Sequence, residues 1–274
     1  MIVSTNCKIN IGLNVVTKRK DGYHDIESLM YPVLGFHDTL EIDKNAREGI
    51  EFSASGLTLD CPPEKNLCVL TYNEMRRRFP DKVGGVKVHL HKAIPSGAGL
   101  GGGSSNVAAM IKALNEMFDL ALTSSQMEET ASTLGSDTAF FIRNIPLFVA
   151  GRGELLYPAQ VSLKGYKVVI LKPDVSITTA DAYKMVKPRE SKKSLSRLIK
   201  HPIESWRGYI GNDFEEVMFP RFPEIEKAKA TLYQRGAVYA SMSGSGSAVY
   251  GIFLPGSNPK FDDVEIFIYQ EDMA

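Results

Sequence analysis

Alternating apolar and polar residues predict strands in the first third of the chain. Residues 2–16 and 39–60 are predicted to form strands with turns between them. Residues 86–91 alternate strictly, as expected for a strand with one buried face. His89 and His91 fall on the other face of that strand. We interpret them as solvent-facing positions, because no third ligand of suitable spacing accompanies them.

Helical spacing of apolar residues predicts three helices in the same region. The first covers residues 67–79 and ends in three arginines, which we interpret as a solvated helix end. The second follows a glycine-rich stretch, and the third is predicted to begin with a capping box of Ser125 and Glu128 and to end at Gly135. The defining apolar positions are Leu67, Leu70, Met75 and Phe79 in the first helix, and Val107, Met110, Ile111, Leu114, Met117 and Phe118 in the second.

A second set of elements is predicted after residue 157. They are a strand at 166–172, a basic stretch at 184–200 that is typical of a mobile solvated loop, a helix over 224–235 closed by Gly236, and strands near 237–241 and 248–254. Periodicity therefore predicts an α+β protein with two domains, 1–157 and 158–274.

Composition narrows the class of ligand and the compartment. The 274 residues include 32 Lys and Arg against 32 Asp and Glu, so charge favours neither a nucleic-acid nor a membrane partner, and we expect a small-molecule ligand. Three cysteines form no disulfide framework or metal-ligand spacing. The N-terminus lacks the order of a signal peptide and no segment is long and apolar enough for a membrane span, so we expect a cytoplasmic protein. Nothing in the sequence indicates a particular oligomeric state.

The glycine-rich stretch PSGAGLGGGSSN, residues 95–106, lies between a predicted strand and a predicted helix. Such a loop presents backbone N–H groups and the positive end of a helix dipole to an anion, and phosphate is the obvious candidate. The stretch lacks the Gly-Lys-Ser/Thr ending of a Walker loop. Gly97, Gly99 and Gly102 match a dinucleotide fingerprint, but that fold needs an acidic residue about 20 positions later at the end of a second strand, and Asp119 only ends the predicted helix.

The stretch resembles the nucleotide loop of the GHMP kinases, a family of small-molecule kinases. CKINIGL at 7–13 and SMSGSGSAVYGIF at 241–253 are similar to the first and third motifs of that family. The resemblance implies a two-domain α+β GHMP kinase-like fold, with an N-terminal ATP-binding domain, a C-terminal ferredoxin-like domain and the active site in the cleft between them. The residues it assigns to ATP are Pro95, Ser96, Gly97, Ala98, Gly99, Leu100, Gly101, Gly102, Gly103, Ser104 and Ser105.

Three further segments resemble one branch of the family. They are DGYH at 21–24, KPDVSITTADAY at 172–183 and NDFE at 212–215. That branch uses ATP and Mg²⁺ to phosphorylate the 2-hydroxyl of 4-diphosphocytidyl-2-C-methyl-D-erythritol in the non-mevalonate isoprenoid pathway. The alternatives are a homoserine or mevalonate type of GHMP kinase, a related decarboxylase, or a catalytically silent nucleotide-binding protein of the same fold.

The resemblance also implies roles in the reaction. Asp137 in GSDTAFF would take the proton of the substrate hydroxyl, Lys8 would stabilise the developing charge, and Asn10 would help hold the hydroxyl. The alternatives are that Asp137 only caps the next helix and that Lys8 is an exposed strand lysine. The family usually has Pro-Ala before the lysine, whereas this chain has Asn6 and Cys7, and we expect Cys7 to be a buried small apolar residue rather than a nucleophile.

Substrate choice is expected to come from the cytosine ring. Tyr23 and Tyr183 match the two positions that sandwich the ring in this branch, and His24 matches the position beside its edge. The resemblance places Thr179 near the substrate diphosphate, and Gly244 and Gly246 near the methylerythritol phosphate region. The Ser104 and Ser105 hydroxyls are expected to cap the helix and to reach phosphate or the metal, and the metal ligands stay unassigned.

Overall fold

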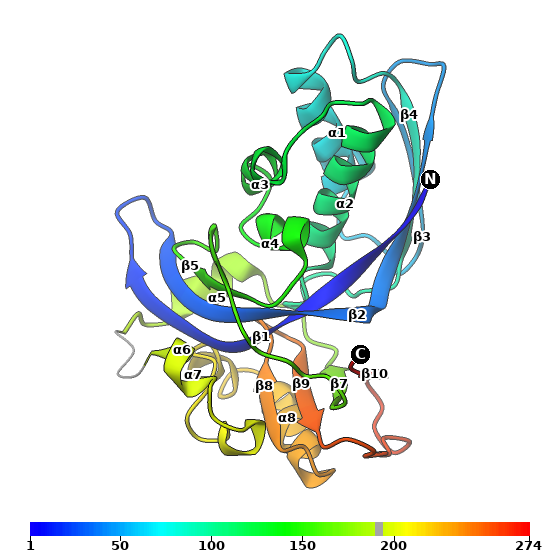
Figure 1. Ribbon diagram of the computed structural model, residues 1–274. Helices are drawn as coiled ribbons and strands as arrows, with labels where there is room; N and C mark the ends of the chain where they lie inside the picture. The colour runs from blue at the N-terminus through cyan, green and yellow to red at the C-terminus, as the bar shows by residue number, and fades with distance from the viewer. Residues whose placement is uncertain (190–193) are drawn as a thin grey trace. The chain divides into compact units, whose positions relative to one another are not determined.

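The chain forms two compact units that are interleaved in the sequence. The computed structural model describes residues 1–189 and 194–274 (Figure 1). The first unit contains Met1–Cys7, Leu34–Ser96 and Gly101–Ile145, and the second contains Lys8–Val33, Gly97–Leu100 and Pro146–Ala274. A single boundary at residue 157 does not separate these compact units, because each unit contains several stretches of the chain. The division into domains 1–157 and 158–274 stays a prediction.

The first unit is a strand layer covered by helices (Figure 1). Strand β4 pairs in parallel with β3 and antiparallel with the second half of β2. Among the helices, α2 packs against α1, α3 and α4. The elements are β1 (Ile2–Lys18) and β2 (His24–Lys44), which both continue into the second unit, then β3 (Ile50–Gly56), η1 (Pro63–Lys65), α1 (Leu67–Arg78), β4 (Val86–Lys92), α2 (Gly102–Met117), α3 (Ser124–Ser132) and α4 (Thr138–Arg143).

A buried ion pair fixes the chain where it leaves β4 toward the glycine-rich loop. Lys92 Nζ lies 2.6 Å from Asp38 Oδ2, and both side chains are buried. The other carboxylate oxygen of Asp38 accepts the backbone N–H groups of Ala93 and Ile94 at 2.8 and 2.7 Å. A buried charge is stable only when it is paired and hydrogen-bonded, and this carboxylate has three donors. The entry to the loop is therefore held by charge-assisted bonds.

The second unit contains a four-stranded antiparallel sheet with helix α8 against it. The strand order is β10-β7-β9-β8, with Ile170 opposite Tyr250, and α8 contacts β7, β8 and β9 (Figure 1). The first half of β2 pairs with β5. The elements are β5 (Leu147–Ala150), β6 (Leu155–Pro158), β7 (Lys167–Lys172), α5 (Thr179–Met185), α6 (Leu195–Leu198), η2 (Ile203–Ser205), α7 (Glu215–Met218), α8 (Pro223–Gln234), β8 (Tyr239–Met242), β9 (Val249–Phe253) and β10 (Phe267–Asp272).

The predicted ends of helix α3 were wrong at both sides. Its N-cap is Thr123, whose hydroxyl accepts from the N–H of Gln126, and the Gln126 side chain accepts from the N–H of Thr123. The Thr-x-x-Gln box starts two residues before the predicted one and stops Ser125 from acting as the cap. The helix ends at Ser132, so Gly135 is not its cap. Gly236, by contrast, follows α8 with φ +97°, as predicted for a C-terminal glycine.

The apolar face of α1 also differs from the prediction. Leu70 is 38 % exposed, and the buried positions are Cys68, Val69, Tyr72 and Met75, together with Thr71. The three terminal arginines form ion pairs: Arg77 and Arg78 bind Glu74, and their hydrogen bonds hold the pKa of that carboxyl at about 2. Of the run predicted to be a solvated helix end, only Arg77 is well exposed, and Arg76, which pairs with Glu48, and Arg78 are half-buried.

Several strands and several short helices, among them α5, α6 and α7, were missed by periodicity. Strand β2 begins at His24 instead of residue 39, and β5, β6 and β10 were not predicted. In the basic stretch 184–200, α6 buries Leu195, so this part is not a solvated loop, while residues 190–193 lie outside the described residues.

The paired histidines of β4 have hydroxyl partners on the neighbouring strand. His89 contacts Ser53 and Ser55, and His91 contacts Ser55, at 2.9–3.0 Å. His91 is exposed and His89 is half-buried. Within residues 1–189 and 194–274, no group of three or more His, Cys, Asp or Glu side chains is arranged to hold a metal ion. No helix in that part of the chain is long and apolar enough to cross a membrane.

The cysteines should differ in reactivity. Cys7 and Cys68 are fully buried, as predicted for Cys7, and burial raises the pKa of Cys68 to about 12, whereas Cys61 is half-buried. At pH 8 the thiolate fraction of Cys68 is then about 10³-fold below that of an ordinary thiol. We expect one thiol to react quickly with a thiol-specific chromogenic reagent in the native protein and three after denaturation. Cys61→Ser should remove the fast phase, and its persistence would contradict this assignment.

Candidate active site

The glycine-rich loop joins β4 to α2 and leaves the start of α2 open. Gly97, Gly99 and Gly101 have φ of +61°, +75° and +74°, a region that side chains rarely adopt. Gly101 is the N-cap of α2, and no side chain caps this helix within the described chain. Its first-turn N–H groups and the helix dipole therefore remain available to an anion, as the loop-to-helix arrangement predicted. The expected cap by the hydroxyls of Ser104 and Ser105 is wrong, because both residues lie inside the helix.

The glycines of the loop are required for different reasons. A Cβ on Gly99 would lie 2.0 Å from the carbonyl oxygen of Ser243, and one on Gly102 would lie 2.9 Å from Ile94 Cγ2. At both glycines, other atoms of the protein already occupy the space that a Cβ would need. A Cβ on Gly97 would meet only the carbonyl oxygen of Ile177, at 3.9 Å. The loop thus combines intramolecular contacts at Gly99 and Gly102 with open space at Gly97, where a ligand can approach the backbone.

Lys8 is buried in the second unit and points at the loop. Its ammonium donates to Asn10 Oδ1 and, at 2.9 Å, to the carbonyl oxygen of Gly99. The side chain is 2 % exposed, so the alternative that Lys8 is an exposed strand lysine is wrong. Asn10 in turn donates to Ser28 Oγ at 2.9 Å. The structure therefore brings together two predicted site residues, Lys8 and Asn10, with the predicted phosphate loop.

Asp137 directly precedes α4 in the first unit. Its side chain makes no capping hydrogen bond, so the alternative that it only caps this helix is wrong. Thr138 Oγ1 instead donates to the carbonyl oxygens of Ala131 and Gly135, at 2.5 and 2.6 Å. A Cβ on Gly135 would lie 4.0 Å from Ser104 Oγ, so this segment lies beside the start of α2. The joint action of Asp137 and Lys8 stays a prediction.

Asn6, which stands where the family usually has proline, has a specific partner. Its side-chain amide exchanges two hydrogen bonds with the amide of Asn144, at 3.1 and 2.8 Å. Asn144 has φ +52° and ends α4. The substitution therefore ties β1 to the helix that follows Asp137.

The third motif, residues 241–253, forms hydrogen bonds with the phosphate loop. Ser243 Oγ donates to the carbonyl oxygen of Gly99 at 2.9 Å, and the N–H of Ala248 donates to that of Ala98 at 3.1 Å. A Cβ on Gly244 would lie 3.2 Å from Gly99 Cα and 3.4 Å from Lys8 Nζ. Gly244 thus lies beside Lys8 and the loop, and Gly246 stabilises the same turn by donating its N–H to the carbonyl oxygen of Ser243 at 3.0 Å.

Two of the three residues predicted to bind cytosine, Tyr183 and His24, form an aromatic cluster in the second unit. Tyr183 stacks on His24, with centroids 5.0 Å apart and planes at 26°, and contacts Phe214 edge-on at 5.0 Å. Tyr23 is 54 % exposed, and the Arg152 guanidinium lies 4.9 Å from its ring centre. Burial, with a smaller effect from Lys18, lowers the pKa of His24. A neutral imidazole offers one donor and one acceptor, which suits the polar edge of a pyrimidine.

Thr179 and Thr178 differ in their surroundings. Ser245 Oγ lies 3.4 Å from Thr179 Oγ1, which links the third motif to the start of α5. Thr178 is the N-cap of α5 and accepts from the N–H of Asp181 at 3.1 Å. Its hydroxyl has a structural role, whereas Thr179 lies beside the third motif, where the sequence predicted a contact with the substrate diphosphate.

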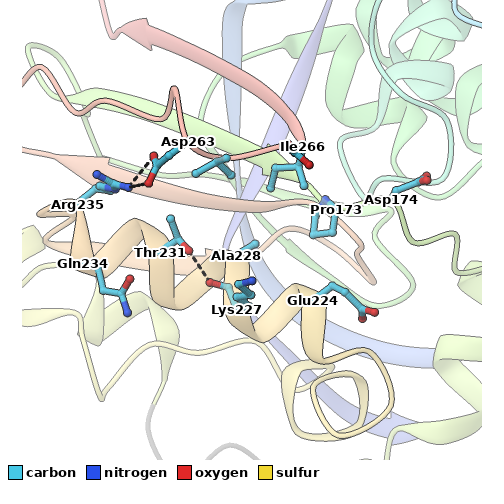
Figure 2. A pocket seen from close by; sticks show the side chains of 12 residues that line it. Pro173, Asp174, Glu224, Lys227, Ala228, Thr231, Gln234, Arg235, Asp263 and Ile266 are labelled. Carbon is cyan, nitrogen blue, oxygen red and sulfur yellow. Dashed lines mark hydrogen bonds and ion pairs between the residues drawn. The ribbon is translucent and has the colours of Figure 1, made fainter.

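Two cavities in the second unit lie outside this group of residues. A cavity of about 540 Å³ lies between α8 and the segment before β10. Figure 2 shows the side chains that line it, with Arg235 ion-paired to Asp263 at its wall. It contains none of the predicted site residues. A second cavity of about 640 Å³ is lined mainly by polar and charged residues, including Asn14, Asn212 and Asp213.

Comparison with known proteins places the chain in a family. Residues 66–145 match the GHMP kinases N terminal domain and residues 194–266 match the GHMP kinases C terminal domain. A protein of Bacteroides fragilis, 4-diphosphocytidyl-2-C-methyl-D-erythritol kinase, is 44 % identical over all of both chains. The chain belongs to the GHMP kinase family. This GHMP kinase is also 47 % identical to the Bacteroides thetaiotaomicron kinase of the same name, over 96 % of each chain.

Solved structures agree with the family assignment. A crystal structure of 4-(cytidine 5'-diphospho)-2C-methyl-D-erythritol kinase has a TM-score of 0.78 at 28 % identity and covers 92 % of this GHMP kinase and 90 % of that chain. Homoserine kinase from Cytophaga hutchinsonii shares the fold, with a TM-score of 0.69 at 16 % identity over 98 % and 95 % of the two chains. The predicted α+β GHMP kinase fold is therefore confirmed, and ATP is the co-substrate that this membership implies.

Proposed function

We propose that this protein transfers the terminal phosphate of ATP to the 2-hydroxyl of 4-diphosphocytidyl-2-C-methyl-D-erythritol, releasing ADP, in the non-mevalonate route to isoprenoid precursors. The observation that carries the proposal is the full-length similarity, at 44 % and 47 % identity, to two relatives that bear the name of this kinase. The aromatic cluster of Tyr183, His24 and Phe214 supports it, because a cytidine group offers a ring to stack and a polar edge to bind.

The residues divide the chemistry between them. Asp137 accepts the proton of the 2-hydroxyl as its oxygen attacks the terminal phosphorus, and the bond from that phosphorus to the ADP oxygen breaks. The Lys8 ammonium, held by Asn10 and the Gly99 carbonyl, stabilises charge that develops near the loop. The amides at the start of α2 bind phosphate oxygens. The transfer is direct, with no phosphorylated enzyme intermediate.

Mg²⁺ is proposed as the accompanying cation. When bound, it neutralises charge on the phosphates of ATP. The hydroxyls of Ser104 and Ser105 in the first turn of α2 are the chain's proposed contribution to holding it, since hydroxyl oxygens suit this hard cation. The absence of nucleic-acid and membrane partners and the cytoplasmic location stay predictions.

A substrate panel tests the proposed function. ADP release by the purified protein is measured with ATP and Mg²⁺ against the cytidine substrate, homoserine, mevalonate and galactose in parallel. We expect turnover only on the cytidine substrate. Turnover on another alcohol alone would keep the kinase and remove the cytidine pocket, and inactivity on all four would favour a silent nucleotide-binding protein.

Tyr23→Ala should weaken binding of the cytidine substrate. Loss of a stacked ring costs roughly 1–3 kcal/mol, so KM should rise about 5- to 150-fold while KM for ATP stays close to that of the wild type. Tyr23→Phe keeps the ring and should behave like the wild type. Steady-state kinetics on the wild type and the two variants tests this prediction. An unchanged KM for the cytidine substrate in Tyr23→Ala would show that Tyr23 does not stack on the cytosine ring.

A further inference from the structure

The segment 211–214 contacts three parts of the proposed substrate site. The segment runs beside β1 and forms two backbone hydrogen bonds with Leu13. The N–H of Leu13 donates to the carbonyl oxygen of Gly211 at 2.9 Å, and the N–H of Asp213 donates to the carbonyl oxygen of Leu13 at 2.8 Å. The Asp213 carboxylate also accepts the N–H of Val15 at 2.8 Å. Since β1 carries Lys8 and Asn10, the segment is attached to the strand that presents them.

Asn212 connects this segment to the third motif. Its side-chain amide donates to the carbonyl oxygens of Met242 and Gly244, each at 2.8 Å, and its Oδ1 accepts the N–H of Phe214 at 2.9 Å. The side chain is 5 % exposed. Both amide hydrogens and the carbonyl are therefore used, in a buried place where each lost bond leaves an unsatisfied backbone group.

The same segment supports the aromatic cluster. Phe214 is fully buried and meets Tyr183 edge-on, and Tyr183 stacks on His24. The hydrogen bond from the Phe214 N–H to the Asn212 side chain holds Phe214 in place beside these rings. One side chain, Asn212, thus links the turn beside Lys8 to the rings assigned to the cytosine.

We propose that Asn212 is a positioning residue that sets the spacing between the phosphate-transfer end and the cytosine end of the substrate site. The inference rests on the proposed function and goes beyond it, because Asn212 acts through Gly244 and Phe214 and need not touch the substrate. Reacting groups must be held close to their productive geometry, and a small displacement is costly in rate. Asn212 therefore matters for both substrate binding and turnover.

The test is Asn212→Asp, which keeps the size of the side chain and replaces the two donors by an oxygen. A carboxylate oxygen facing two carbonyl oxygens is repelled, so the turn at Gly244 should shift. For the cytidine substrate we expect KM to rise and kcat to fall, with kcat/KM lower by about 10- to 100-fold. Asn212→Ser, which retains one hydroxyl donor, should fall between this variant and the wild type.

A matched control separates positioning from folding. Asn115 also binds backbone with its amide, accepting from the N–H of Leu122 at 2.9 Å and donating to its carbonyl at 3.4 Å, but contacts no residue of the proposed site through these bonds. Asn115→Asp should lower the melting temperature and leave KM unchanged. A purely structural role for Asn212 would give that same result, a lower melting temperature with wild-type KM, and would overturn the proposal.

The wild-type measurement comes first, so that the two ideas fail separately. A wild type that does not turn over the cytidine substrate removes the proposed function. A wild type that is active, with Asn212→Asp and Asn212→Ser retaining its KM and kcat, removes only the positioning role.

Discussion

Asp137→Asn should lower kcat by about 10²- to 10⁴-fold, the range expected when a general base is removed. Asparagine has the shape of aspartate but does not take up the proton of the attacking hydroxyl. Because asparagine also matches aspartate in size, we expect folding to be nearly unaffected. ATP binding should also persist, since the loop and the start of α2 are unchanged.

The measurement is steady-state ADP release, combined with calorimetric ATP titration of the same preparations. Asp272→Asn is a suitable control, because it removes an exposed carboxylate that pairs with Lys167 on the sheet of the second unit. It should keep wild-type kcat. Near-normal turnover by Asp137→Asn would remove the base assignment, whereas loss of ATP binding would indicate damage to the nucleotide site.

Gly99→Ala should destabilise the protein by about 2–5 kcal/mol. The new methyl group would lie 2.0 Å from the Ser243 carbonyl oxygen, and alanine at φ +75° adds backbone strain. The obstructing atom is backbone in the third motif, so it cannot move away by a change of rotamer. Activity should fall as well, since the Gly99 carbonyl accepts from Lys8.

Gly97→Ala is the matched control for this prediction. Gly97 also has positive φ, +61°, but its nearest obstruction is 3.9 Å away. It should cost only the strain of the left-handed backbone, about 1–2 kcal/mol. Urea unfolding of both variants isolates the contact with Ser243. Equal losses of unfolding free energy would show that close packing at Gly99 contributes nothing.

Local patterns predicted the limits of two long helices closely. Helix α1 and helix α8 appear within about one residue of their predicted limits, because helical spacing and a C-terminal glycine are local signals. Strand β2 was missed over its first half because Ser28–Val33 are all buried, so apolar and polar residues do not alternate there. The cap of α3 was misplaced because Thr123 and Ser125 are both acceptable N-cap residues and only the structure distinguishes them.

Site residues were predictable from the sequence where they belong to family motifs. Lys8, Asn10 and Gly99 were found through the family resemblance, and the structure places them in contact. Asn212 was noted only as part of a segment typical of one branch. Its hydrogen bonds reach residues 30 and 32 positions away, and no periodicity or spacing indicates such partners.

The interleaving of the two units affects how the chain is made. Tyr250 donates its hydroxyl to the carbonyl oxygen of Asn10 at 2.8 Å, across 240 positions of sequence. At about 5–20 residues per second, the ribosome needs roughly 10–50 s to synthesise that interval. The buried apolar residues Ile9, Ile11 and Val15 belong to the second unit, most of which is made last. During synthesis β1 can pair early with β2, but it waits for its later partners Gly211, Asp213 and Tyr250, so we expect the strand that carries Lys8 to benefit from a chaperone's protection.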